Sequence, residues 1–75
     1  MKTISLDPWQ EIVGRLTAVN VEDDVVVLTM TVSNRQIKVK VPNLPIDPQE
    51  VLGKLVGLLR TDDPSHPFVL RRIKV

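Results

Sequence analysis

The feature that most constrains this chain is the order in which β-rich runs, turns and one helix start follow one another. Runs rich in Val, Ile and Thr, partly in strict alternation, predict five strands. In chain order these strands are expected at 11–21, 25–33, 36–41, 55–61 and 68–75. A helix start lies between the third and fourth runs, at 47–53, and residues 1–10 read as an extended lead-in. This order in 75 residues predicts one all-β domain over 1–75.

The composition agrees with strands rather than helices. The chain has thirteen Val and five Ile against one Ala, and β-branched side chains suit a pleated surface. The third run is the clearest, because Ile37, Val39 and Val41 alternate with polar residues and are expected to point inward. Gly14, inside the long first run, predicts a bend that lets one strand serve both halves of a barrel.

The segment 47–53 carries the signals of a single helical turn. Asp47 is the expected N-cap, Pro48 the first helical residue and Glu50 the second partner of a capping box. Gly53 supplies the left-handed residue that ends the turn. An SH3-like barrel would lack a helix at this position. The order of elements therefore predicts a small five-stranded Greek-key barrel with one short helical turn between strands three and four.

Two glycine-bearing strand starts resemble those of a known family. They are Gly14-Arg15-Leu16 at strand one and the Gly-Lys-Leu-Val-Gly run at 53–57 before and within strand four. With the β-rich second strand, they resemble the OB-fold proteins that bind single-stranded nucleic acid, over roughly residues 11–75. The resemblance implies a ligand groove across strands two and three, flanked by the loops at 22–24 and 62–67.

The charges suggest where such a ligand would bind. The net charge is only +1, yet residues 1–34 hold two bases and five acids, whereas residues 35–75 hold eight bases and four acids. A polarised surface follows if the fold keeps these halves apart. The cations of expected strands three to five would contact phosphates, and the single tryptophan would stack on a base. These candidate residues are Arg35, Lys38, Lys40, Arg60, Arg71, Arg72, Lys74 and Trp9.

Several of these side chains also have a structural interpretation. Lys38 and Lys40 can keep an outward strand face soluble or protect a sheet edge from pairing. Trp9 can cap one end of the barrel, with its N–H bonded to a backbone acceptor. Phe68, at the start of the last strand, is expected in the core.

A second functional hypothesis comes from the departures from the OB pattern. Expected strands two and three contain no aromatic residue, and the loops at 22–24 and 62–67 together carry five acids, which oppose a phosphate backbone. The first two strands also carry valines on a second face. These valines, which predict a surface for a protein partner or a homodimer, are Val13, Val19, Val21, Val25 and Val27. The two hypotheses are weak, salt-dependent binding of single-stranded nucleic acid, and a protein-interaction or self-assembly module.

The residue types favour neither catalysis nor cofactor binding. The chain has no Cys and no Tyr, no Gly-rich phosphate loop and no metal motif. His66 lies close to Asp62 and Asp63, a composition that can bind a cation, but a solvated turn is the favoured interpretation. No run approaches the roughly 18 apolar residues of a membrane span. We therefore expect a non-enzymatic protein without cofactor, metal or membrane partner, and the absence of cysteine fits the cytoplasm.

Overall fold

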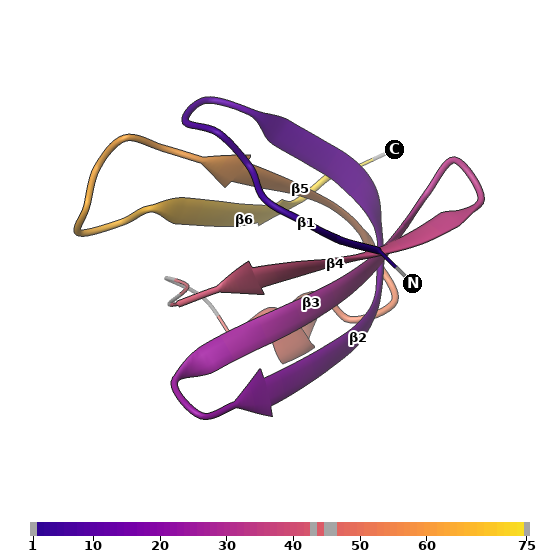
Figure 1. The fold of residues 1–75 in the computed structure, drawn as a ribbon. Helices are drawn as coiled ribbons and strands as arrows, with labels where there is room; N and C mark the ends of the chain where they lie inside the picture. The colour runs from indigo at the N-terminus through magenta and orange to yellow at the C-terminus, as the bar shows by residue number, and fades with distance from the viewer. Residues whose placement is uncertain (1, 43, 45–46, 75) are drawn as a thin grey trace.

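The chain forms one curled β-sheet with a single short helix (Figure 1). The computed structural model describes residues 2–42, 44 and 47–74. The elements are β1 (Lys2–Ile4), β2 (Glu11–Glu22), β3 (Val25–Val32), β4 (Arg35–Val41), the 3-10 helix η1 (Pro48–Val51), β5 (Leu55–Arg60) and β6 (Phe68–Arg72). The prediction of an all-β domain is confirmed. No helix in the described part of the chain is long and apolar enough to cross a bilayer.

The sheet has six strands in the order β1-β4-β3-β2-β5-β6. The prediction of five strands is wrong, because the expected lead-in contains β1, which pairs in parallel with β4 from Lys2↔Ile37 to Ile4↔Val39. Every other pairing is antiparallel. The two edge strands, β1 and β6, do not pair with each other within the described residues. A closed barrel is therefore not confirmed, and the sheet is open between these edges.

Strand β2 is bent and belongs to both halves of the sheet, as Figure 1 shows. Its first part pairs with β5 and its second part with β3, and Arg15 takes part in both pairings. At Gly14 the backbone passes so close to β3 that an added Cβ would lie 2.6 Å from the carbonyl oxygen of Thr31 and 2.7 Å from a methyl carbon of Val32. Only glycine allows this approach, so the predicted bend is confirmed.

A register shift between Leu16 and Ala18 changes the alternation of β2. An irregularity of one residue exchanges the two faces of a strand beyond it. Val19 therefore packs against the core, and its expected outward position is wrong. The shift was not predictable from the run of residues, because it arises from the pairing with β3.

The inward face of β4 agrees with its predicted alternation. Val39 and Val41 are 1% and 0% exposed, Ile37 packs partly buried beside them, and Phe68 is buried. The buried core contains residues of every strand other than β1. It also contains one residue of η1 and one residue of the 5–10 segment. Its members are Leu6, Leu16, Leu28, Met30, Val39, Val41, Val51, Val56, Leu58, Phe68 and Leu70.

The helical turn also forms as predicted, although it is a 3-10 helix of four residues. The Asp47 carboxylate accepts a hydrogen bond of 3.0 Å from the backbone N–H of Gln49, and Gly53 has a φ of 82°. The Gly53 N–H then donates to the carbonyl of Leu16 at 2.7 Å, and the Leu16 N–H donates to the carbonyl of Lys54 at 3.0 Å. These two bonds fasten the start of β5 beside β2.

The last strand is shorter than expected. β6 ends at Arg72, and the N–H of Ile73 bonds to the carbonyl of Leu55 at 2.9 Å. Val75, the last residue of the predicted strand, lies outside the described residues. Ile73 and Lys74 therefore lie next to the start of β5, a position that matters for the charges described below.

The close approach at Gly14 predicts an asymmetric response to glycine replacement. Gly14→Ala should lower the free energy of unfolding by about 1–3 kcal/mol, because the new methyl group meets fixed backbone of β3. Gly57→Ala is the matched control: its Cβ would meet the flexible Glu11 carboxylate at 3.1 Å, so its change should stay within about 1 kcal/mol. Urea denaturation of both variants measures the difference in the free energy of unfolding. Equal decreases in the two variants would contradict a special requirement for glycine at position 14.

Candidate functional site

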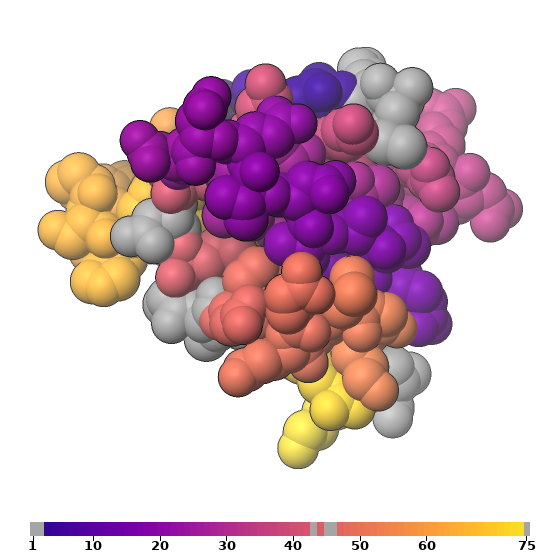
Figure 2. Space-filling model, turned by 90° about the horizontal axis from the view of Figure 1, so that it is seen from below, coloured from indigo at the N-terminus to yellow at the C-terminus, as the bar shows by residue number. Residues whose placement is uncertain are grey.

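Four cationic side chains converge on one groove at the start of β5. The groove has a volume of about 420 Å³ and is lined by Arg15, Lys54, Leu55, Arg72, Ile73 and Lys74. In Figure 2 the orange segment that leads into β5 lies beside the yellow C-terminal end of the chain. Among the described residues that line this basic groove, none is acidic. It holds more cations than the cavity beside Arg35 or the pocket lined by Lys40 and Arg60.

The sheet pairings explain why these residues meet. Arg15 stands opposite Leu55 on one side and Thr31 on the other, and directly opposed residues share one face of a sheet. The bond from the Ile73 N–H to the Leu55 carbonyl brings the C-terminal end to the same place. The groove therefore depends on contacts between β2, β5 and the residues after β6.

Arg15 is held in position by the turn before β5. One of its guanidinium nitrogens donates to the carbonyl of Gly53 at 2.7 Å. A guanidinium has five N–H donors, so this single bond orients the group and leaves donors for a ligand. Arg15 and Lys54 are both exposed. Four like charges around one groove repel one another, and an anion bound between them would relieve that repulsion.

Two further predicted lysines lie on the outer face of the sheet. Lys38 and Lys40 stand opposite Thr29 and Val27 of β3. Val27 is only 2% exposed, although it is not part of the core cluster. We interpret its burial as cover by its cross-strand neighbours, because lysine stems lie along apolar surface while their ammonium groups reach water. Lys38 is half-buried, whereas Lys40 is exposed and lines a pocket together with Arg60 and Phe68.

The remaining predicted arginines do not line the basic groove. Arg35 lines a separate, mainly apolar cavity of about 500 Å³ together with Ile4, Ile12, Val32, Ser33 and Ile37. Arg60 is half-buried, donates a hydrogen bond to the carbonyl of Leu6 and lies 6.0 Å from the centre of the Phe68 ring. Arg71 contacts the Glu11 carboxylate at 3.5 Å. Arg60 therefore connects the 5–10 segment to the core, and the charge of Arg71 is partly compensated.

Trp9 lies at the opposite end of β5 from the groove. Its backbone N–H donates to the carbonyl of Arg60, the last residue of β5, at 2.6 Å. The groove is at the first residue of that strand, and six residues in extended conformation span roughly 16 Å. Trp9 is 63% exposed. The structure therefore separates Trp9 from the cations of the basic groove and places it beside Arg60.

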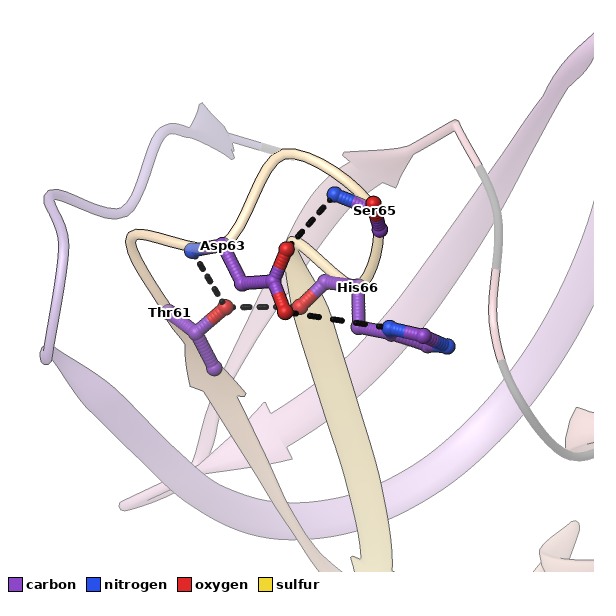
Figure 3. A network of polar contacts seen from close by, with 4 residues as sticks. All are labelled: Thr61, Asp63, Ser65 and His66. Carbon is purple, nitrogen blue, oxygen red and sulfur yellow. Dashed lines mark hydrogen bonds and ion pairs between the residues drawn. The ribbon is translucent and has the colours of Figure 1, made fainter.

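The loop between β5 and β6 is ordered by its own hydrogen bonds (Figure 3). The hydroxyl of Thr61 donates to the carbonyl of His66 at 2.6 Å, and the carboxylate of Asp63 accepts from the N–H of Ser65 at 2.8 Å. His66 Nδ1 is 3.8 Å from the other oxygen of Asp63, and both side chains are more than half exposed. No group of three or more metal-binding side chains is found among the described residues. The loop is thus an exposed turn held by its own hydrogen bonds.

Two of the four cations in the groove, Arg15 and Lys54, were missed by the sequence reasoning. Arg15 and Lys54 were each treated only as part of a glycine-bearing strand start. The signal that could have found them is the double pairing of the bent first strand, which places Arg15 next to the fourth strand. Arg72 and Lys74 were predicted, and the structure brings them to the same groove.

Comparisons of the chain with protein-family models, with curated proteins and with solved structures find no match. The pairing of the strands and the positions of the charges are the observations from which a function is inferred.

The division of the arginines into structural and surface groups predicts different effects on stability. Arg60→Ala should lower the free energy of unfolding by roughly 1–3 kcal/mol, because it removes a part-buried hydrogen bond and a contact with Phe68. Arg71→Ala should change it by less than about 1 kcal/mol, because exposed ion pairs contribute little. Urea denaturation measures both. Equal effects would contradict the assignment of Arg60 to the structural group.

Proposed function

We propose that this protein is a non-enzymatic β-domain that binds single-stranded nucleic acid weakly, with the basic groove as its main contact. The observation that carries the proposal is the gathering of Arg15, Lys54, Arg72 and Lys74 around one groove without an acid among its lining residues. Such a cluster matches the repeated charge of a phosphate backbone. The outward ammonium groups of Lys38 and Lys40 would extend the contact across the sheet.

The proposed mechanism is electrostatic. Each cation that meets a phosphate releases counterions from the nucleic acid, and this release supplies most of the affinity of non-specific binding. The apolar side chains of Leu55 and Ile73 lie between the cations and would contact sugars or base faces. No aromatic side chain lines the groove in the described residues. Stacking, which contributes about 1–3 kcal/mol per base in other single-strand binders, is therefore missing, and we expect low affinity and little sequence preference.

An OB-like architecture for residues 11–72 is part of the same proposal. Three features support it: three antiparallel strands precede η1 and two follow it, the long strand β2 pairs with both β3 and β5, and the sheet curls while remaining open. OB folds are partly open five-stranded barrels that bind ligands on the face of their second and third strands. The corresponding strands here are β3 and β4, the latter carrying Lys38 and Lys40.

The alternative, a self-assembly module built on outward valines, has less support. Val19 packs against the core, Val27 is 2% exposed and Val25 is half-buried. Val13 and Val21 are exposed, but they are eight residues apart on β2, with the bend at Gly14 and the register shift after Leu16 between them. Isolated exposed apolar residues are normal on protein surfaces, so these two valines do not form one association surface.

The proposal predicts a measurable salt dependence. If four cations contact phosphates, the logarithm of the association constant should fall against the logarithm of salt concentration with a slope of about −3. We expect a dissociation constant on the order of 10⁻⁵–10⁻⁴ M for a labelled dT oligonucleotide at low salt. Fluorescence anisotropy at several salt concentrations measures both quantities. Absence of binding at low salt would rule the proposal out.

Neighbouring arginines on β6 provide a matched test of the groove. Arg72→Gln and Arg71→Gln each remove one positive charge, but only Arg72 lines the groove, whereas Arg71 contacts Glu11. Arg72→Gln should weaken oligonucleotide binding several-fold and make the salt slope shallower by about 0.7, whereas Arg71→Gln should leave both nearly unchanged. Equal effects of the two substitutions would mean that only total charge matters and that the groove is not the contact.

A further inference from the structure

The turn that carries Trp9 is held in place at both ends. Within the turn, the N–H of Gln10 donates to the carbonyl of Asp7 at 3.0 Å, and the N–H of Asp7 donates to the side-chain oxygen of Gln10 at 2.8 Å. Across the turn, the N–H of Trp9 donates to the carbonyl of Arg60 at 2.6 Å, and the N–H of Arg60 donates to the carbonyl of Gln10 at 3.0 Å. The backbone of residues 7–10 is therefore fixed against the end of β5.

This rigid turn presents a tryptophan in an unfavourable state. Trp9 has a φ of 69°, in the left-handed region that bulky side chains rarely adopt. The residue is nevertheless 63% exposed, so most of the burial that normally stabilises a tryptophan is absent. A smaller residue such as Asn would suit the turn better. Strain of this kind, kept without a gain in packing, points to function rather than to folding.

The surroundings of Trp9 carry the opposite charge to the basic groove. Asp7 belongs to the same turn, and Asp62 and Asp63 follow Arg60, to which Trp9 is hydrogen-bonded; all three acids are exposed. Figure 1 shows the 5–10 loop and the 61–67 loop at the same side of the molecule. The neighbouring cation, Arg60, is turned toward the Leu6 carbonyl and the Phe68 ring. A second cation, Lys40, lines a pocket with Arg60 and Pro67, and the three exposed acids outnumber these two cations.

We propose that the Trp9 turn is a docking point for an arginine- or lysine-rich segment of a partner protein. A cation placed over the indole face is attracted by the ring, and the carboxylates of Asp7, Asp62 and Asp63 complement further positive charge on the same segment. The turn is preformed, so the partner does not have to order it on binding. This docking point lies at the opposite end of β5 from the basic groove and does not depend on nucleic-acid binding there.

Tryptophan fluorescence can report ligand binding at this turn, because Trp9 is the single tryptophan of the chain. The probe is a capped pentapeptide of alternating glycine and arginine, and the control is the same peptide with glutamate in place of arginine. Titration of the protein at low salt should give a saturable change in tryptophan emission with the arginine peptide and none with the glutamate peptide. No change with the arginine peptide up to millimolar concentration would overturn the proposal. So would a larger change with a dT oligonucleotide than with the peptide.

Variants separate docking from folding and from the basic groove. With a fluorescently labelled arginine peptide, Trp9→Asn and the double variant Asp7→Asn, Asp62→Asn should each weaken binding roughly 3- to 10-fold. Trp9→Asn should keep or raise the melting temperature, because Asn tolerates the φ of this position. Arg72→Gln, in the groove, should leave peptide binding unchanged. Unaltered peptide binding by Trp9→Asn would overturn the proposal. The proposal would also be overturned if light scattering showed that the protein dimerises without peptide and that Trp9→Asn abolishes the dimer.

Discussion

The bend of β2 at Gly14 is the constraint on which both the fold and the basic groove depend. The backbone there comes so close to the Thr31 carbonyl that no side chain fits. This approach allows the residues before the bend to pair with β5 and those after it to pair with β3. Arg15 takes part in both pairings, so it lies where the two halves of the sheet meet.

Most of the fold could be predicted where the signal was local. The alternation of β4, the cap at Asp47, the left-handed Gly53 and the bend at Gly14 each depend on a few neighbouring residues, and each is confirmed. The strand β1 could not be predicted, because three residues carry no periodicity and their partner is about 35 positions away. The inward turn of Val19 depends on a register shift, which belongs to the pairing of two strands and not to either sequence.

The candidate site was predictable only in part, for the same reason. The sequence can show that a cation belongs to a strand. It does not show which cations of other strands lie beside it, because that depends on how the strands pair. Arg72 and Lys74 were therefore found, while Arg15 and Lys54, which complete the groove, were missed. Arg60 shows the converse: it reads as one more surface cation, yet its guanidinium bonds to a carbonyl brought close from 54 residues earlier in the chain.

The net charge of +1 conceals two ends of opposite sign. The basic groove lies at the start of β5 and the acidic surroundings of Trp9 at its end, separated by a strand of six residues, or roughly 16 Å. This distance exceeds the Debye length of about 8 Å at physiological salt, so the charges of one end would have little effect on a ligand bound at the other. At 0.01 M salt the Debye length reaches about 30 Å. The acidic end would then repel a nucleic acid that extends past the groove. Lowering the salt concentration would therefore strengthen both the attraction of phosphates to the groove and their repulsion by the acids near Trp9.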